Sequence, residues 1–160
     1  LGNEAGYGSN FEAAYDWVKA EDPSRAVQYE QAGKTGKTDI FCPMYYGYND
    51  CLKYCEDDSM NRPLIQCEYA HAMGNSEGGF KEYWDMIRKY PKYQGGFIWD
   101  YIDQALLVKD EITGREVLRY GGDFDDRPSD YEFSGNGIVF ADRTEKPAMQ
   151  EVKYYYGLQK

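Results

Sequence analysis

Hydrophobic residues recur at helical spacing in three stretches of the chain. They repeat every three to four positions over 10–20, over 77–90 and over 147–158, which predicts three amphipathic helices. Pro91 follows the second stretch and Pro147 opens the third, as expected of proline at the ends of helices.

Some helix starts have candidate capping residues. Asn10 is the expected N-cap of the first helix, and Asn49 or Asp50 would cap a short helix that continues through Cys55. The sequence therefore predicts four helices, of which the one near 50 is the shortest.

Short apolar runs predict four strands, at 26–29, 39–46, 64–69 and 95–101, with Pro43 interrupting the second. Each run ends in polar or aromatic residues. Strands that alternate with helices indicate parallel pairing, so the order is typical of part of a (β/α)8 TIM barrel of the α/β class. The polar strand ends would then lie on one face of the barrel.

Between the last strand and the last helix, the pattern becomes irregular. The residues 110–114 predict a turn between two short β-like segments, and 120–143 form a long loop rich in aromatic, acidic and glycine residues. Loops of this length in compact domains are usually functional or disordered, and its five aromatic residues argue against disorder.

Composition excludes some classes of protein. The chain has 160 residues, 42% of them hydrophobic, enough for one domain with a core, and we expect 1–160 to be part of a single domain. Its net charge of −10 argues against a nucleic-acid-binding protein, because binding phosphates needs a basic surface. The sequence contains no apolar run long enough to cross a membrane.

The four cysteines favour a reducing compartment such as the cytoplasm. Cys42 and Cys67 lie within apolar strand-like runs, where a free thiol behaves as a small hydrophobic residue. Cys51 and Cys55 are four residues apart, but there is no second cysteine pair and only one histidine, so a zinc site is not expected.

The candidate chemistry centres on two carboxylates. Glu68 ends an apolar strand and precedes His71, the only histidine, so it is either a capped strand end paired with a cation or a catalytic group. Glu4 lies in a glycine-rich segment shaped like a strand end. Two carboxylates that flank one bond, about 5–5.5 Å apart, perform retaining glycoside hydrolysis. Tyr45 and His71 could donate hydrogen bonds to the nucleophile or to the sugar, and Trp99 could stack on the sugar. Acidic ends of barrels also bind metals in other enzymes, so this reading of the residues alone leaves alternatives open.

Six motifs, in the same order and over essentially the whole chain, resemble the β-galactosidases of glycoside hydrolase family 2. They are LGNEAGYG (1–8), FCPMYYG (41–47), IQCEYAHAMGNSEGGF (65–80), QGGFIWDYIDQ (94–104), YGGDFDD (120–126) and NGIVFADRTEKPAMQEVK (136–153). The stretch CEYAHAMGNS is the most specific of them. The resemblance implies a (β/α)8 barrel, of which this chain supplies roughly the second half: strands 5–8 and the end of strand 4.

The resemblance also implies an activity and its residues. The activity is hydrolysis of terminal β-D-galactosides such as lactose, by double displacement through a covalent galactosyl-enzyme. Glu4 matches the general acid/base and Glu68 the nucleophile, with Tyr45 hydrogen-bonded to the nucleophile. Residues that match substrate-binding positions are Asn3, His71, Trp99 and Asn136.

Two metal ions follow from the same resemblance. Glu4 matches one ligand of an active-site Mg²⁺, whose other ligands lie outside this chain. Phe133, through its carbonyl, and Asn136 match part of a Na⁺ site. The segment 124–135 departs most from the family pattern.

The resemblance implies that the chain works with the remaining domains of a larger enzyme, as a homo-oligomer at full length, and that the fragment is inactive alone. The alternatives are a β-glucuronidase or β-mannosidase of the same family, or a non-catalytic carbohydrate-binding relic. Three other carboxylates are expected to be structural: Glu30 as a charge at a strand end, and Asp100 and Asp103 as hydrogen-bonding residues of the barrel rim.

Overall fold

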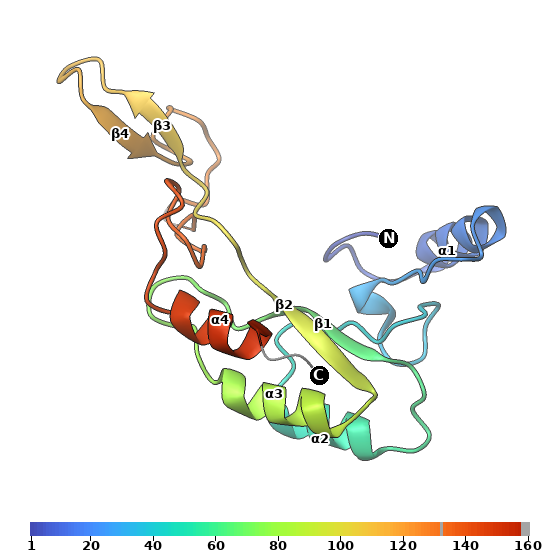
Figure 1. The fold of residues 1–160 in the computed structure, drawn as a ribbon. Helices are drawn as coiled ribbons and strands as arrows, with labels where there is room; N and C mark the ends of the chain where they lie inside the picture. The colour runs from blue at the N-terminus through green and yellow to red at the C-terminus, as the bar shows by residue number, and fades with distance from the viewer. Residues whose placement is uncertain (132, 158–160) are drawn as a thin grey trace. The chain divides into compact units, whose positions relative to one another are not determined.

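A computed structural model describes residues 1–131 and 133–157 of the chain. Its elements are α1 (Ser9–Glu21), the 3₁₀ helix η1 (Glu30–Ala32), α2 (Tyr48–Glu56), β1 (Leu64–Tyr69), α3 (Phe80–Lys89), β2 (Tyr93–Ile98), β3 (Leu106–Lys109), β4 (Glu116–Arg119) and α4 (Met149–Gly157) (Figure 1). None of the helices in these ranges is long and apolar enough to cross a membrane.

The described residues form two compact units. The first unit consists of Leu1–Tyr69 and Lys81–Phe97, and the second of Ala70–Phe80 and the described residues from Ile98 onward. The sequence-based prediction of one domain over 1–160 stays a prediction.

In the first unit, β1 and β2 form a two-stranded sheet with α3 between them in the sequence (Figure 1). The segment 39–46 was expected to be a full strand. It pairs with β1 only through two isolated parallel bridges, Phe41 with Leu64 and Met44 with Glu68. Pro43 lies between the bridges and has no N–H to donate, which explains why the ladder is interrupted.

The core of the first unit lies between β1, β2 and the helices α2 and α3. Leu64 and Tyr93, from the two strands, are fully buried, and α2 and α3 contribute Tyr54 and Ile87. Phe41 stacks on Tyr54 with ring centroids 4.5 Å apart. This packing fixes β1 and therefore the backbone on which Glu68 is carried.

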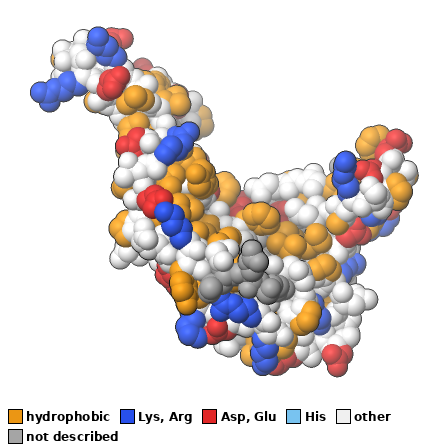
Figure 2. Space-filling view, in the orientation of Figure 1, with side chains coloured by type: hydrophobic (Ala, Val, Ile, Leu, Met, Phe, Trp, Pro, Cys, Tyr) orange, Lys and Arg blue, Asp and Glu red, His pale blue; other side chains and the backbone are white. Residues whose placement is uncertain are grey.

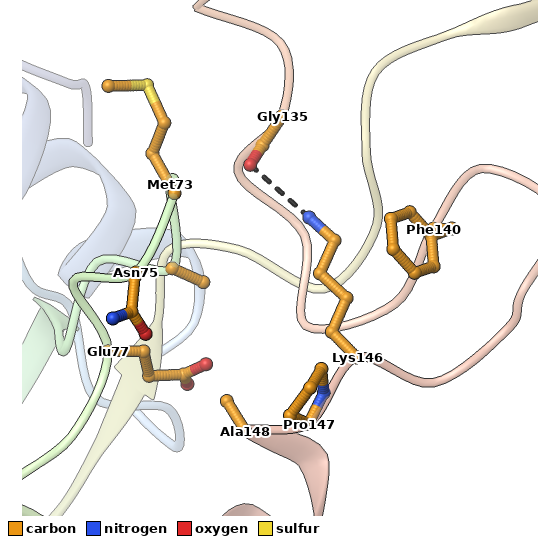
Figure 3. Close-up of a pocket in the computed structure, with 10 residues that line it drawn as sticks. Met73, Asn75, Glu77, Gly135, Phe140, Lys146, Pro147 and Ala148 are labelled. Atoms are coloured by element: carbon orange, nitrogen blue, oxygen red, sulfur yellow. Dashed lines mark hydrogen bonds between the residues drawn. The ribbon is translucent and has the colours of Figure 1, made fainter.

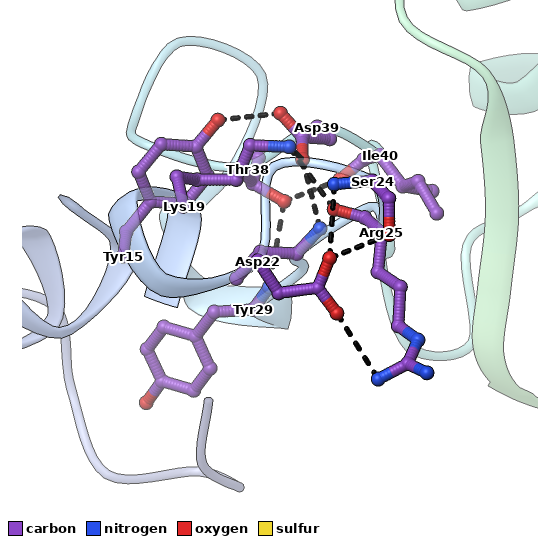
Figure 4. Close-up of polar contacts among 10 residues, drawn as sticks. Tyr15, Lys19, Asp22, Ser24, Arg25, Tyr29, Thr38, Asp39 and Ile40 are labelled. Atoms are coloured by element: carbon purple, nitrogen blue, oxygen red, sulfur yellow. Dashed lines mark hydrogen bonds and ion pairs between the residues drawn. The ribbon is translucent and has the colours of Figure 1, made fainter. Parts of the chain in front are cut away.

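The expected strand over 26–29 is wrong, because this segment makes no ladder. Val27 instead exchanges hydrogen bonds with Asp39: its N–H donates to Asp39 Oδ2 at 2.8 Å, and its carbonyl accepts from the Asp39 N–H at 2.8 Å. Asp39 also accepts hydrogen bonds from the Tyr15 hydroxyl and, at 3.1 Å, from Lys19 Nζ (Figure 4). Burial acts to raise the pKa of the Asp39 carboxyl, but the hydrogen bonds from Tyr15, Val27 and Lys19 hold it below its ordinary value.

The starts of all four α-helices differ from the prediction. The N-caps of α1 and α2 are Gly8 and Gly47, and neither makes a side-chain capping hydrogen bond, so the expected caps at Asn10 and at Asn49 or Asp50 are wrong. Helix α3 begins at Phe80, after Gly79 with a φ of +70°. Helix α4 begins at Met149, so Pro147 precedes the helix and does not open it as predicted, and position 158 of the predicted helix lies outside the described residues.

In the second unit, β3 and β4 form the antiparallel hairpin that the sequence predicted around the turn at 110–114. Asp110 closes the turn, since its carboxylate accepts hydrogen bonds from the Thr113 N–H at 2.7 Å and from Arg119 at 2.9 Å. Hydrophobic and charged side chains both lie on the surface of the hairpin (Figure 2), and Leu106 is 65% exposed.

The described residues of the long loop at 120–143 contain no helix and no strand ladder, as expected. The loop is attached through a parallel bridge between Ile102 and Val139. A Cβ on Gly137 would lie 2.2 Å from the Asp103 backbone nitrogen, so only glycine fits this close approach of two backbone segments.

Candidate active site

Glu68 lies near the end of β1 and is held by Tyr45 at two points. The Tyr45 hydroxyl donates a hydrogen bond of 2.8 Å to Glu68 Oε2. The Tyr45 N–H donates another of 2.8 Å to the Glu68 carbonyl oxygen. The parallel bridge between Met44 and Glu68 brings the two residues together, so both the backbone and the hydroxyl of Tyr45 fix the position of the carboxylate.

The surroundings of Tyr45 are strongly negative. Burial, the hydrogen bond to Glu68 and the charges of Glu68 and Glu4 raise the pKa of Tyr45 well above its ordinary value. Its hydroxyl therefore remains a proton donor over the whole physiological range.

Glu4 lies on an exposed loop, next to Asn3, with a φ of +48°. Its N–H donates a hydrogen bond of 2.6 Å to Glu30 Oε1. One residue further, the Ala5 N–H donates to the Tyr29 hydroxyl at 3.0 Å, and that hydroxyl donates to the Gly6 carbonyl at 2.7 Å. Residues 29–30 thus fix the backbone of the loop that carries Glu4.

The contact with Glu4 was not predicted. The sequence indicated only that Glu30 is a structural charge at the end of an apolar run. No local pattern connects Glu30 to a residue 26 positions earlier. The only signal in the sequence that could have drawn attention to Glu30 is its place directly after the apolar run 26–29.

The second unit contains the other residues predicted to bind substrate. His71 Nδ1 accepts a hydrogen bond of 3.2 Å from the Met73 N–H, and its ring lies 5.6 Å from the ring of Phe133. The Trp99 carbonyl accepts from the Ala72 N–H at 2.8 Å, which joins the segment after β1 to the residues after β2. Trp99 Nε1 is buried and has no hydrogen-bond partner within the described parts of the chain.

Asn136 is almost fully buried in the second unit, at 1% exposure. Its Nδ2 donates to Gln104 Oε1 at 3.1 Å, and its carbonyl accepts from the Asp100 N–H at 2.8 Å. Its Oδ1, by contrast, is buried without a partner among residues 1–131 and 133–157. A buried amide oxygen without a hydrogen bond is costly, and an oxygen of this kind suits a cation ligand.

Asp100 and Asp103 hold the backbone around Asn136, in agreement with their expected structural role. Asp100 Oδ1 accepts a hydrogen bond of 2.9 Å from the Ile102 N–H. Asp103 Oδ1 accepts from the Gly137 N–H at 2.8 Å and forms an ion pair of 2.7 Å with Lys146 Nζ. These contacts fix the residues on both sides of Asn136.

A cavity of about 540 Å³ lies within the second unit. Its lining combines the segment after His71 with the segment before α4, including Met73, Glu77, Phe140 and Lys146 (Figure 3). Lys146 Nζ donates to the Gly135 carbonyl at 3.3 Å. Burial and the charge of Glu151 raise the pKa of Glu77 to about 7, and Glu77 Oε1 is buried without a described partner. Sequence reasoning did not identify Glu77.

All four cysteines are free thiols. Burial raises the pKa of Cys51 to about 12, so this thiol stays protonated on the buried side of α2. Among the residues that the structure describes, no group of three or more histidine, cysteine, aspartate or glutamate side chains is arranged to hold a metal ion.

Comparison with known proteins places this chain among glycoside hydrolases. Residues 1–160 match the family described as "Glycosyl hydrolases family 2, TIM barrel domain". The chain is 55% identical to the "Beta-galactosidase large subunit" of Leuconostoc lactis and 54% identical to that of Lactobacillus helveticus, in both cases over 100% of this chain. It spans 26% of the length of these relatives.

Solved structures share the fold at low sequence identity. A β-D-glucuronidase of Dictyoglomus thermophilum aligns with a TM-score of 0.60 at 16% identity, over 99% of this chain and 31% of that one. A GH2 β-galacturonidase of Eisenbergiella tayi aligns with a TM-score of 0.57 at 16% identity, over 94% of this chain and 30% of that one. Since the family match covers every residue of the sequence, the chain belongs to the TIM barrel domain family of the glycosyl hydrolases family 2.

Proposed function

We propose that this chain is part of a retaining glycoside hydrolase that acts on terminal β-D-galactosides such as lactose. The observation that carries the proposal is the carboxylate of Glu68, which is held near the end of β1 by the Tyr45 hydroxyl at 2.8 Å. The choice of galactosides is supported by the identity of 54–55% to proteins named beta-galactosidase large subunit.

In the first step, Glu68 attacks the anomeric carbon of the sugar. Its carboxylate forms the C1–O bond of a galactosyl-enzyme while the bond to the leaving-group oxygen breaks, and Glu4 gives its proton to that oxygen. In the second step, Glu4 takes a proton from water, the water oxygen bonds to C1, and the Glu68 carboxylate leaves. The hydrogen bond from Tyr45 orients Glu68 before the attack.

Asn3, His71, Trp99 and Asn136 are the residues that we propose to bind the sugar. Asn3 precedes Glu4 on the same exposed loop. The others lie in the second unit, where Trp99 offers an aromatic face and an indole N–H without a described partner. An aromatic face and a few placed polar groups are the usual means of orienting a sugar.

The buried amide oxygen of Asn136 supports a Na⁺ site in the second unit. The buried Oδ1 of Asn136 has no partner within the described ranges, and the Phe133 carbonyl belongs to the same segment of chain. We propose these two oxygens as Na⁺ ligands, with the ion supplying a fixed positive charge near the sugar-binding residues. For Mg²⁺, the described residues offer Glu4 but no cluster of three ligating side chains. Further ligands would have to come from the rest of the enzyme, and we derive no step through this ion.

The remaining parts of the proposal concern the complete enzyme. Because the chain spans 26% of the length of its relatives, we propose that the other domains of such a polypeptide are needed, and that residues 1–160 alone have little or no activity. The name "large subunit" of these relatives supports a further polypeptide partner. A homo-oligomeric assembly of the full-length protein stays a prediction.

The proposal can be tested by trapping the covalent intermediate. The complete polypeptide is incubated with an activated 2-deoxy-2-fluoro-galactoside, and the labelled peptide is identified by mass spectrometry. The fluorine slows hydrolysis of the galactosyl-enzyme, so we expect a single adduct on Glu68 and none in the Glu68→Gln variant. An adduct on another residue, or none at all, would contradict the proposed mechanism.

The same assay separates the alternatives. A glucuronidase or mannosidase would be labelled by the corresponding fluoro-sugar and not by the galactoside. A non-catalytic binding domain would show no adduct with any of them, while Glu68→Gln would retain its affinity for sugar. Residues 1–160 on their own should take up little or no label.

A further inference from the structure

The contact between Glu30 and Glu4 joins a carboxylate to the peptide group of another acidic residue. Glu30 Oε1 accepts the hydrogen bond of the Glu4 N–H at 2.6 Å. Hydrogen bonds to an ionised acceptor are shorter and roughly twice as strong as those between neutral groups. The side chain of Glu30 therefore restrains the backbone of Glu4 directly.

This restraint acts on an unfavourable backbone conformation. The φ of Glu4 is +48°, in the left-handed region, which costs a non-glycine residue about 1–2 kcal/mol. Such a conformation persists only where surrounding contacts fix it. The exposed loop of Glu4 offers little packing of its own, so hydrogen bonds to its N–H groups have to do this.

Glu30 is itself rigidly placed. It is the first residue of η1 and follows Tyr29, which is 1% exposed. The ring of Tyr29 stacks on Phe11 with centroids 4.0 Å apart, and its hydroxyl bonds to the backbone of Ala5 and Gly6. The carboxylate of Glu30 thus extends from a buried anchor to the loop that carries Glu4.

The direction of the Glu4 side chain depends on this backbone. Displacement of a catalytic group by about 1 Å can lower the rate by roughly 100-fold. A general acid has to lie within hydrogen-bonding distance of the leaving-group oxygen. A residue that fixes the φ of the acid therefore affects proton transfer more than it affects the binding of the sugar.

We propose that Glu30 is a positioning residue for Glu4: its carboxylate, through the Glu4 N–H, holds the acid/base carboxyl in the orientation required for proton transfer. This inference rests on the proposed role of Glu4 as the acid/base. It assigns to Glu30 a hydrogen bond to the backbone of Glu4 and not a contact with the sugar.

The test uses the leaving group of the substrate as the readout. Glu30→Ala and Glu30→Gln are made in the complete polypeptide, and kcat/KM is measured for a dinitrophenyl galactoside, whose leaving group needs no proton, and for an alkyl galactoside, whose leaving group does. We expect Glu30→Ala to lower kcat/KM for the alkyl substrate by roughly 10- to 100-fold and for the dinitrophenyl substrate by less than about 3-fold. Glu30→Gln keeps an oxygen that can accept from the Glu4 N–H, so it should retain most activity on both substrates.

Three controls make the result decisive. Labelling with the fluoro-galactoside gives the fraction of active sites in each variant. The rates are divided by this fraction, so partial unfolding of a variant does not affect the comparison. Glu4→Ala should show the same selective loss as Glu30→Ala, only larger. Glu21→Ala, which removes an exposed carboxylate at the end of α1, should change neither rate.

The outcomes separate the two proposals. If Glu4→Ala shows no selective loss, the proposed role of Glu4 fails. Suppose that Glu4→Ala shows the selective loss. If Glu30→Ala then lowers kcat/KM equally for both substrates, or for neither, the inference about Glu30 alone is overturned. A Glu30→Gln variant as impaired as Glu30→Ala would show that the charge matters and not the hydrogen bond, and would also overturn it.

Discussion

Tyr45 and Glu68 are joined by two hydrogen bonds of 2.8 Å, one from the Tyr45 hydroxyl to the Glu68 carboxylate and one between their backbones. The backbone contact places Tyr45 next to β1, and the hydroxyl then reaches the side chain of the same partner. Since the pKa of Tyr45 is raised by burial, by this hydrogen bond and by the charges of Glu68 and Glu4, its hydroxyl does not lose its proton near neutral pH.

The first prediction concerns the catalytic effect of this hydroxyl. Tyr45→Phe should lower kcat by roughly 10- to 150-fold, because a hydrogen bond to a charged group contributes about 1.5–3 kcal/mol. Steady-state kinetics of the complete polypeptide on a galactoside would measure it. Tyr101→Phe, at an exposed position 62% accessible to solvent, is the matched control. A Tyr45→Phe enzyme with unchanged kcat would contradict a role for the hydroxyl in orienting Glu68.

The second prediction concerns the buried hydroxyl of Tyr29. Tyr29→Phe removes hydrogen bonds to Ala5 and Gly6 but keeps the stacked ring, so the loop of Glu4 should lose about 1–2 kcal/mol of local stability. Faster amide hydrogen exchange in the peptide 1–7 of the complete polypeptide would measure this. Unchanged exchange there would show that the loop is held by other contacts.

The third prediction concerns Gly137. Its Cβ would lie 2.2 Å from the Asp103 nitrogen and 2.4 Å from the Ile102 carbonyl carbon, and backbone atoms cannot move aside as a flexible side chain can. Gly137→Ala should therefore destabilise the region by about 2–4 kcal/mol and displace the neighbouring Asn136. Hydrogen exchange of the peptide 134–140 and kcat/KM would both report it.

The matched control is Gly135→Ala, because a Cβ at Gly135 would meet no atom within 4 Å. This variant should have nearly the same hydrogen exchange in the peptide 134–140 and nearly the same kcat/KM as the unsubstituted protein. Equal effects of the two substitutions would indicate that chain flexibility, and not steric overlap, explains the glycine at 137.

The fourth prediction concerns the pH dependence of Glu77. Burial and Glu151 raise its pKa from 4.5 to about 7, so the folded state binds the proton more tightly than the unfolded state. Its contribution to stability is thus fully present below about pH 4.5 and is lost as the pH rises to about 7. The amide of Glu77→Gln does not ionise, so this loss of stability with rising pH should be absent in the variant.

At pH 8 the Glu77→Gln variant should be more stable than the parent by about 1 kcal/mol, less than the full pKa shift implies, because solvent screens a half-buried side chain. At pH 4 the two should be equal. Hydrogen exchange of the peptide 72–80, which includes the wall of the cavity, at both pH values would measure the difference. A difference independent of pH would contradict the assignment to Glu77 ionisation.

Local sequence patterns predicted the elements in which apolar residues recur at regular spacing. Helix α1 and strand β1 were located to within a residue at each end, because their apolar spacing alone specifies them. The hydrogen bond from Tyr45 to Glu68 agrees with what the resemblance of the motif FCPMYYG (41–47) implied.

Other features depend on contacts between distant residues. The apolar run 26–29 looks like a strand, but Val27 bonds with Asp39, whose side chain takes the place of a neighbouring strand. Asn10 has the chemistry of a cap, yet α1 begins one residue earlier and is preceded by Gly8. Likewise, the sequence gives no sign that Glu30 reaches Glu4. For Val27 and Glu4 a side chain supplies the hydrogen bond to the backbone, and for α1 the Gly8 carbonyl accepts the first N–H bonds of the helix. No periodicity encodes any of these contacts.

The left-handed backbone of Glu4 and Tyr45, each with a φ of +48°, has a consequence for how the enzyme can change. Glycine adopts this conformation without a steric penalty, so replacing either residue with glycine would relieve the backbone while removing its functional group. At Glu4, which lies on an exposed loop, selection for a more stable fold and selection for activity therefore act in opposite directions, whereas at Tyr45 the loss of the hydrogen bond to Glu68 offsets the relief of the backbone. A search for thermostable variants that is blind to turnover should recover glycine at position 4 and, with it, an inactive enzyme.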